Sequence, residues 1–302
     1  MSDPLASLET GAASEPERWF ADWQNPEHAR RFDGRAALSE RQLLANLEVI
    51  NDVRLLRRHL SPQQAGRVLE VGCATGEMYR YLRIRFPRMT YAGLDISQPA
   101  IERARAKYPA GAFHRCEPAE PVHQALNHLG LESPFTVVYS KDVLHHQLDP
   151  WGFLEGLVAV TSELLILRTR TRDVGGTLLD PEQSCQFHYG GWMPYLVLNL
   201  EELIQRLREL CPRAHVVVLR NRKVLGGREN RYLPKACYLP ETGTAETAVA
   251  VLLPPGGGSA FGGKTDRPGE VVVTDRQDEE PIYPWADRVS FGLRKLRSIL
   301  KP

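Results

Sequence analysis

The chain has 302 residues, of which 42% are hydrophobic and 25% charged, proportions close to those of an average globular protein. They exclude a wholly disordered chain, a collagen and a coiled-coil rod. The 38 basic residues nearly balance the 37 acidic ones, for a formal charge of +1. That balance argues against a protein whose main task is to neutralise nucleic-acid backbones, so we expect no nucleic-acid partner.

Targeting and redox features point to a reducing compartment. The N-terminus has neither the basic nor the apolar part of a secretory signal, and no apolar run approaches the roughly 18 residues of a membrane span. The five cysteines are widely spaced, and none lies in a C-x-x-C pair. We therefore expect a cytoplasmic protein with no transmembrane span and no metal site. The cysteines are Cys73, Cys116, Cys185, Cys211 and Cys237.

The first part of the chain divides into a tail and a helical cap. Residues 1–16 are rich in Ser, Ala, Glu and Pro, which predicts a disordered N-terminus. Residues 17–62 form the predicted cap, which opens with an aromatic and basic stretch around Trp19–Phe32. Ser39 then starts a helix that is expected to run to about Leu60, because apolar residues recur at helical spacing.

Residues 63–254 alternate short β-rich runs with helical segments. Such alternation predicts βαβ units, a mainly parallel sheet and helices on both faces, which is a doubly wound α/β fold. The expected seven strands are Arg67–Val71, Thr90–Leu94, Ala112–Cys116, Phe135–Tyr139, Leu164–Arg168, His215–Leu219 and Ala248–Leu253. The expected helices are Glu77–Phe86, Pro99–Tyr108, Ala119–Leu129, Pro150–Val160 and Leu200–Leu210.

Three segments depart from this alternation. The long connection 169–198 is rich in Arg, Gly and aromatics, and a connection of that length usually has a function. Residues 255–270 read as a flexible linker. The extension 271–302 contains a basic amphipathic helix over Trp285–Leu300, which suits peripheral contact with an anionic membrane, docking on its own domain, or a homodimer interface.

The most informative stretch is Val68–Glu77, VLEVGCATGE, in which a strand runs through a glycine turn into a helix. This geometry brings backbone N–H groups and a helix N-terminus close to a ligand. The dinucleotide fingerprint G-x-G-x-x-G fails after Gly72, and no Gly-Lys-Ser/Thr follows for a phosphate-binding loop. Glu70 and Glu77 also disfavour a pyrophosphate.

The pattern E-x-G-x-[GA]-x-G from Glu70 to Gly76, with an acid at Asp95 after the next strand, resembles the class I S-adenosylmethionine-dependent methyltransferases. The resemblance covers about residues 40–220 and implies a Rossmann-like methyltransferase fold with S-adenosylmethionine as cofactor. It implies that Asp95 accepts hydrogen bonds from the ribose hydroxyls. Ala74 stands where glycine is commonest in the family. The implied cofactor contacts are Glu70, Gly72, Cys73, Ala74, Gly76, Met78, Asp95, Ile96, Glu117 and Ser140.

Candidate catalytic residues follow the fourth strand, where the ligand side of such a sheet lies. Histidine suits deprotonation of a hydroxyl or ammonium group, so His145 or His146 is the candidate base. The alternative is that the pair only braces the loop. Methyl transfer needs little beyond alignment, since the sulfonium is already an activated donor.

Candidate acceptor contacts lie in the 169–198 connection. Its arginines and aromatics suit a sugar ring, an aromatic acceptor or an anionic group. The alternative is that the aromatics only pack the connection onto the sheet. The candidates are Arg170, Arg172, His188, Tyr189, Trp192 and Tyr195.

These features predict a methyltransferase that acts on a small molecule, with O-methylation of a sugar-like or secondary-metabolite acceptor favoured. The alternatives are an N-methyltransferase, an enzyme acting on a macromolecule, and a cofactor-binding scaffold without catalysis. SKDV follows the fourth strand in place of the [DNS]-P-P-[YFW] of enzymes that methylate adenine or amides, and the net charge is neutral. Both observations weigh against a nucleic-acid substrate.

Overall fold

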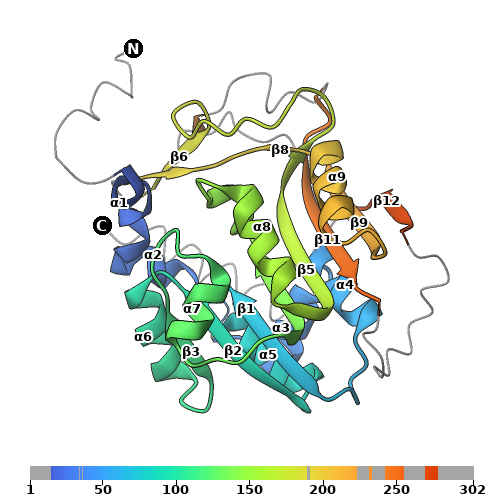
Figure 1. Cartoon of the computed structure of the whole chain (residues 1–302). Coiled ribbons are helices and arrows are strands. Elements are labelled where there is room, and N and C mark those ends of the chain that lie inside the picture. Colours follow the sequence, from blue (N-terminus) through green and yellow to red (C-terminus); the bar gives the residue numbers. More distant parts are fainter. Residues whose placement is uncertain are drawn as a thin grey trace, which may run out of the picture.

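The structure, a computed structural model, describes residues 15–33, 35, 37–188, 191–222, 231–232, 242–254 and 269–277. A mostly parallel sheet forms its centre (Figure 1). The order is β12-β9-β11-β5-β4-β1-β2-β3, with β8 paired to β5. The strands are β1 (Gly66–Val71), β2 (Met89–Asp95), β3 (Ala112–Arg115), β4 (Phe135–Lys141), β5 (Thr161–Arg172), β8 (Leu198–Asn199), β9 (His215–Arg222), β11 (Ala245–Leu252) and β12 (Val271–Asp275).

The doubly wound, mainly parallel fold expected from the sequence is confirmed, and every expected strand is present. The sheet has nine strands in the described residues, so the predicted seven was too few. One addition is the short β8. The other is β12, which pairs in parallel with the outer edge of β9 and lies in a part of the chain that we assigned to the C-terminal extension.

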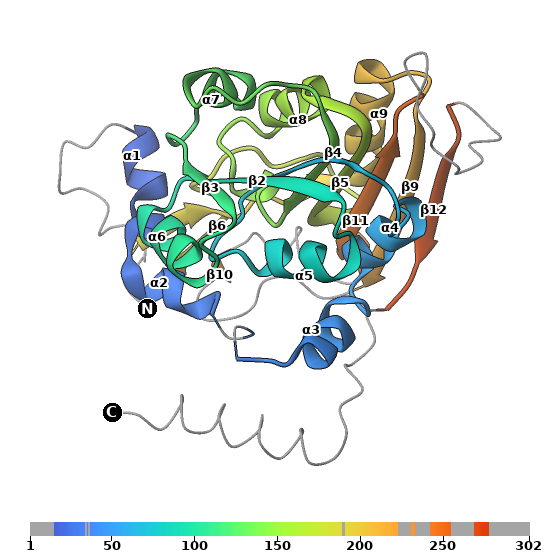
Figure 2. The same cartoon turned by 90° about the horizontal axis from the view of Figure 1, so that it is seen from below.

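Helices cover both faces of the sheet (Figure 2). Neighbouring residues of a strand point to opposite faces, so Leu69 and Val138 pack under one helical layer while Val68 and Val137 pack under the other. One layer contains α7 (Val122–His128), α8 (Pro150–Ala159) and α9 (Leu200–Leu210). The other contains α3 (Glu40–Leu47), α4 (Asn51–His59), α5 (Glu77–Arg85) and α6 (Gln98–Lys107).

The predicted single helix from Ser39 to Leu60 is wrong, because the chain forms two helices there, α3 and α4. Ser39 caps α3, as the sequence indicated, and Gln42 completes a capping box with it. The break comes at Ile50, whose backbone is extended. Asp52, in the first turn of α4, is buried and accepts a hydrogen bond from the hydroxyl of Tyr139 in β4.

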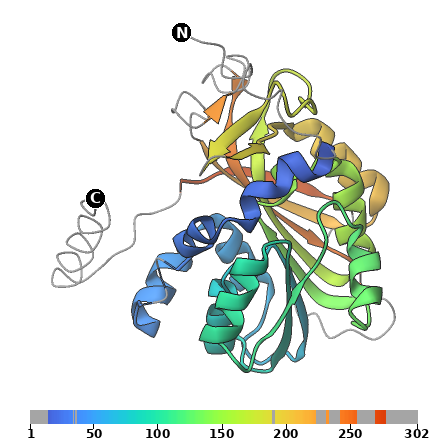
Figure 3. The same ribbon diagram turned by 90° about the vertical axis from the view of Figure 1, so that its left-hand side faces the viewer.

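The N-terminal segment crosses from a small second sheet to α6 (Figure 3). It comprises α1 (Glu15–Phe20), the 3₁₀ turn η2 (Ala21–Gln24) and α2 (Pro26–Arg31). The second sheet contains β6 (Cys185–His188), β7 (Gly191–Pro194) and β10 (Arg231–Tyr232).

The connection after the fifth strand is more regular than expected. Strand β5 continues to Arg172, so Arg170 and Arg172 belong to the central sheet rather than to a loop. The remainder contains the β6–β7 hairpin and β8. Tyr189, the 255–268 stretch of the predicted linker and the predicted basic helix over 285–300 lie outside the described residues. In the parts of the chain that are described, no helix is long and apolar enough to cross a membrane.

Candidate functional site

The glycine turn after β1 needs glycine at two positions for steric reasons. Gly72 has φ +86°, and a Cβ placed there would lie 2.2 Å from Cγ2 of Val143. Gly76 has φ +84°, and its Cβ would lie 2.9 Å from Cζ of Phe113. Ala74, between them, adopts φ +46°, which L-residues seldom do. The turn is therefore packed closely against its neighbours and holds backbone strain.

Asp95 connects the glycine turn to the loop after β2. One carboxylate oxygen accepts a hydrogen bond from the backbone N–H of Ala74, and the other accepts one from the N–H of Ser97, both at 2.8 Å. Burial raises the pKa of Asp95, and these two N–H groups oppose the rise. The side chain is thus fixed in orientation at the carboxyl end of β2.

Glu70 supports this turn from beneath. It is buried, and the hydroxyl of Tyr91 donates a hydrogen bond to it at 2.5 Å. Burial raises the pKa of Glu70 to about 8, although the bond from Tyr91 opposes the rise. Glu70 is therefore mostly protonated at neutral pH.

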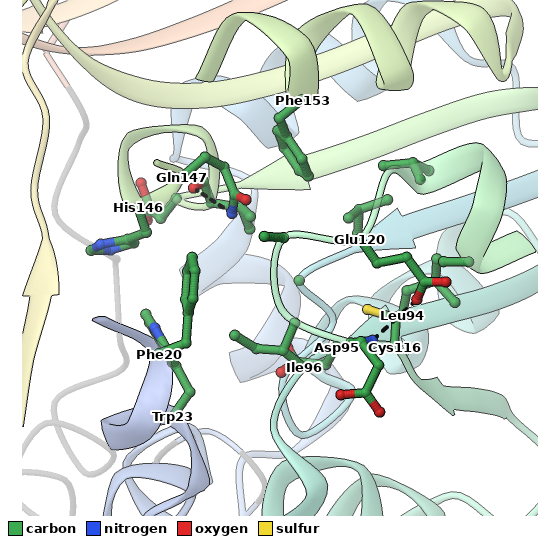
Figure 4. Close-up of a pocket in the computed structure, with 18 residues that line it drawn as sticks. Phe20, Trp23, Leu94, Asp95, Ile96, Cys116, Glu120, His146, Gln147 and Phe153 are labelled. Carbon is green, nitrogen blue, oxygen red and sulfur yellow. Dashed lines mark hydrogen bonds between the residues drawn. The ribbon is translucent and has the colours of Figure 1, made fainter. Parts of the chain in front are cut away.

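A cavity opens at the carboxyl ends of β1, β2, β3 and β4. Asp95, Cys116 and Glu120 lie toward one end of it, while His146 and Gln147 lie toward the other (Figure 4). Its lining includes four carboxylates and no Lys or Arg. They are Asp95, Glu117, Glu120 and Asp142.

The predicted cofactor residues divide into two groups. Gly72, Asp95, Ile96 and Glu117 line the cavity. The others support it without lining it. Cys73 and Met78 are buried in the adjoining hydrophobic clusters, and the hydroxyl of Ser140 donates to the carbonyl oxygen of Val71 at 3.1 Å. The cavity also has a lining residue with φ +59°, Ala119, that the sequence did not single out.

The two candidate histidines differ in position. Both are buried, but only His146 is among the cavity-lining residues. Its Nδ1 lies 2.5 Å from the carbonyl oxygen of Pro194, so Nδ1 must carry the hydrogen and Nε2 the lone pair. Burial lowers the pKa of His146 to about 4, which keeps the ring neutral at neutral pH. His145 packs against Tyr195, and its Nδ1 lies 3.5 Å from the hydroxyl of Thr169.

A group of charged side chains lies behind the His146 end of the cavity. Arg170 contacts Asp142 at 3.0 Å and Glu246 at 3.3 Å, and its Nε donates to the hydroxyl of Tyr195 at 2.9 Å. Arg168 contacts the same two carboxylates at 3.4 and 3.1 Å, and Asp52 at 3.5 Å. We call Asp52, Asp142, Arg168, Arg170 and Glu246 the charge network.

Among the predicted acceptor contacts, Arg170 thus has partners within the protein. The guanidinium of Arg172 donates to the carbonyl oxygen of Gly176. Tyr195 is buried between Arg170 and the two histidines, whereas the ring of Trp192 packs on Phe187. None of these side chains, as placed, lines the cavity. Their contact with an acceptor stays a prediction, as does that of His188.

The N-terminal segment forms another wall. Phe20 and Trp23 line the cavity, and the indole N–H of Trp23 is buried without a partner among the described residues. The side-chain amide of Gln24 donates to the carbonyl oxygen of Ile96 at 2.8 Å, and its oxygen accepts from the N–H of Gln98 at 3.1 Å. Further along, the hydroxyl of Thr75 donates to the carbonyl oxygen of Phe32.

Known proteins match this part of the chain. A family model described as methyltransferase domain matches residues 69–163, which contain the glycine turn, Asp95 and both histidines. The match agrees with the class I S-adenosylmethionine-dependent methyltransferase pattern formed by Glu70–Gly76 and Asp95. This confirms the resemblance seen in the sequence, while the subfamily is not identified.

Two curated methyltransferases match short stretches. Ribosomal RNA small subunit methyltransferase C of Cronobacter sakazakii is 39% identical over 59 residues, which are 20% of this chain and 17% of that protein. Trans-aconitate 2-methyltransferase of Paracidovorax citrulli is 29% identical over 92 residues, 30% of each chain. The chain therefore matches less than a third of the length of either relative.

Solved methyltransferase structures are similar to a larger part of this chain. Magnesium protoporphyrin IX methyltransferase from Synechocystis PCC 6803, crystallised with its cofactor, shares 14% identity at a TM-score of 0.47, covering 80% of this chain and all of that one. The Burkholderia thailandensis 1,6-didemethyltoxoflavin-N1-methyltransferase shares 15% identity at a TM-score of 0.47, covering 81% and 92%.

Sequence reasoning also missed Asp142 as a lining residue of the cavity. It follows β4 directly and has φ +58°, a value that is uncommon outside glycine and occurs at functional sites. The available signal was its place after a parallel strand. In the described part of the chain, no group of three or more His, Cys, Asp or Glu is arranged to hold a metal ion.

Proposed function

We propose that the chain transfers a methyl group from S-adenosylmethionine to a small-molecule acceptor, with O-methylation favoured. The observation that carries this proposal is the cavity itself. It combines the strained glycine turn with a lining of four carboxylates and no Lys or Arg, and one of the four, Asp95, is fixed by backbone N–H groups. A phosphate-bearing nucleotide would meet these carboxylates with no Lys or Arg in the lining to pair with its phosphates.

The cofactor fits these residues chemically. S-adenosylmethionine has a net positive charge, a ribose diol and an apolar base, and when bound it supplies an electrophilic methyl group on sulfur. Each oxygen of Asp95 already accepts one backbone N–H and has a further lone pair, so the carboxylate can also accept the ribose hydroxyls. Ile96 and Cys116 offer apolar contact for the base.

His146 is the proposed base in preference to His145. It lines the cavity, and the Pro194 carbonyl fixes the tautomer that leaves the Nε2 lone pair available. Its low pKa makes it a weak base, so it would assist a hydroxyl that loses its proton late in the reaction, as the positive charge of the methylated oxygen develops. His145 would brace the loop through Tyr195 and Thr169.

Calorimetry and a transfer assay test the proposal. S-adenosylmethionine and S-adenosylhomocysteine should bind with one site per chain, whereas NAD should not bind, because its pyrophosphate would face the carboxylates. Transfer of a radioactive methyl group to compounds of a small-molecule library should follow. Binding of NAD with no binding of S-adenosylmethionine overturns the proposal. Cofactor binding with no transfer to any hydroxyl, amine, RNA or protein acceptor supports the scaffold alternative instead.

A further inference from the structure

Asp142 stands between the charge network and the cavity. Both of its ionic contacts use the same oxygen, Oδ1, which lies 3.0 Å from Nη1 of Arg170 and 3.4 Å from Nε of Arg168. Its Oδ2 forms no hydrogen bond or ion pair with the described residues. The side chain is 31% exposed and lines the cavity. A carboxylate held through one oxygen therefore presents the other to a ligand.

The surroundings keep this carboxylate ionised. Burial alone would raise the pKa of Asp142, but Arg168 and Arg170 outweigh it and hold the pKa far below the usual range. The charge network contains three carboxylates and two guanidiniums. Its positive charges are therefore fewer than its negative charges, and it has no surplus cation that could pair with an anionic ligand. An ionised carboxylate is an acceptor of hydrogen bonds only.

The same end of the cavity is otherwise apolar or neutral. The chain of contacts from Asp142 through Arg170 and Tyr195 leads to His146, whose neutral ring has an acceptor nitrogen. Trp23 packs edge-on against His146, and Phe20 and Phe153 also line the cavity. A ligand here would meet aromatic surfaces and hydrogen-bond acceptors, with no cationic side chain to pair with an anion.

We infer that the methyl acceptor is a ring compound that presents a hydrogen-donating hydroxyl or amine, and not a carboxylate or phosphate, to Oδ2 of Asp142. This inference rests on the proposed function and specifies its substrate class. The arginines of the 169–198 connection had suggested an acceptor with an anionic group. The present inference differs because Arg170 already pairs with Asp142 and Glu246. Asp142 is on this view a specificity-determining residue.

Three probes of one size test the inference: benzyl alcohol, benzylamine and benzoate. Their binding is measured by ligand-observed NMR on protein saturated with S-adenosylhomocysteine. The alcohol and the amine should each bind at least about tenfold more tightly than benzoate. Equal binding of all three, tighter binding of benzoate, or no binding of any probe at millimolar concentration overturns the inference.

Two variants assign the preference to Asp142. Asn tolerates positive φ, so Asp142→Asn should keep the backbone conformation. In this variant, the ratio of the dissociation constant of benzoate to that of benzylamine should fall about tenfold. Glu246→Gln removes a charge from the same two arginines without changing a lining residue, so it should keep the wild-type preference. An unchanged preference in Asp142→Asn, or an equal loss in both variants, contradicts the assignment.

Folding and cofactor binding are checked separately. If Asp142→Asn does not fold, the order of the three probes on the wild-type protein still decides the inference. Calorimetry with S-adenosylhomocysteine is run on every sample. Failure of the wild-type protein to bind it counts against the proposed function, whereas normal binding with the wrong order of probes counts against the substrate class alone.

Discussion

The side chain of Gln24 donates a hydrogen bond to the backbone carbonyl oxygen of Ile96 at 2.8 Å, across 72 residues of sequence. The same side chain accepts from the next turn at Gln98. The amide of Gln24 thus satisfies one backbone carbonyl and one backbone N–H of the β2–α6 loop, which would otherwise form hydrogen bonds with water. The N-terminal segment is thereby fastened beside the residue expected to contact the base of the cofactor.

Gln24→Ala should speed cofactor release. Loss of the two hydrogen bonds would loosen one wall of the cavity, and each bond is worth about 1 kcal/mol. We expect the dissociation rate constant of S-adenosylhomocysteine, measured by stopped-flow fluorescence, to rise roughly fivefold to thirtyfold. Arg18→Ala, which removes the exposed pair with Glu182 and the contact of the guanidinium with the ring of Trp19 but leaves Gln24 in place, is the control. Equal dissociation rates in the two variants would show that the fastening has no kinetic role.

Asp95→Ala should abolish most of the cofactor affinity. The substitution removes the charge-assisted hydrogen bonds to the ribose, each worth roughly 1.5–3 kcal/mol, and also releases the N–H groups of Ala74 and Ser97. Calorimetry measures the loss. Glu117→Ala is a useful comparison, because this lining carboxylate is exposed and already paired with Arg115. Unchanged affinity in Asp95→Ala would refute the cofactor site.

Two glycines with positive φ form a matched pair. Gly72→Ala adds a methyl group that overlaps Val143, while Gly130→Ala adds one with nothing within 4 Å. Both substitutions place a residue with a Cβ in the left-handed backbone conformation, which lowers the free energy of unfolding by about 1 kcal/mol. We expect urea titration to show a further loss of roughly 1–3 kcal/mol in Gly72→Ala alone. Equal losses would mean that Val143 moves aside without cost.

The protonation of Glu70 predicts a pH dependence of stability. Its pKa is raised by burial to about 8 from a reference value of 4.5, so between these values the folded state holds a proton that the unfolded state has lost. The contribution of Glu70 to stability therefore falls as pH rises through this window and is constant above it. Glu70→Gln should remove this dependence, while the Gln oxygen still accepts the bond from Tyr91.

The measurement is the difference in melting temperature between Glu70→Gln and wild type from pH 5 to pH 9.5. The melting temperature of the variant should rise relative to that of wild type up to about pH 8, and the difference should then stay constant. Tyr91→Phe, which removes the bond but not the acid, should keep a clear dependence. A difference that does not vary with pH would show that Glu70 ionises normally in the fold.

His146→Ala should lower turnover by about 10²–10⁴-fold if its Nε2 assists the acceptor, with little change in cofactor affinity. His145→Asn, behind the cavity wall, should have a smaller effect. Because burial lowers the pKa of His146 to about 4, the acid limb of kcat/KM should not fall at pH 6.5, where an ordinary histidine titrates. An acid limb near pH 6.5 would point to a different base.

Local sequence patterns predicted the sheet, the glycine turn and Asp95, because strand-turn-helix geometry depends on neighbouring residues. They could not predict that Arg170 would be paired, since its partners Asp142 and Glu246 lie 28 and 76 residues away in sequence. They also could not decide which of the two histidines, His145 or His146, lines the cavity. Only the contact with Pro194, across 48 residues, distinguishes His146.

The antiparallel strand β11 has a consequence for the order in which the protein can be made. It enters between β5 and β9, and it brings Glu246 to Arg168 and Arg170. A growing polypeptide that has left the ribosome as far as β9 already contains the glycine turn, Asp95 and both histidines. It still lacks the carboxylate that shares the two guanidiniums with Asp142. Biosynthesis must therefore pass residue 246 before the cavity can acquire its final electrostatics.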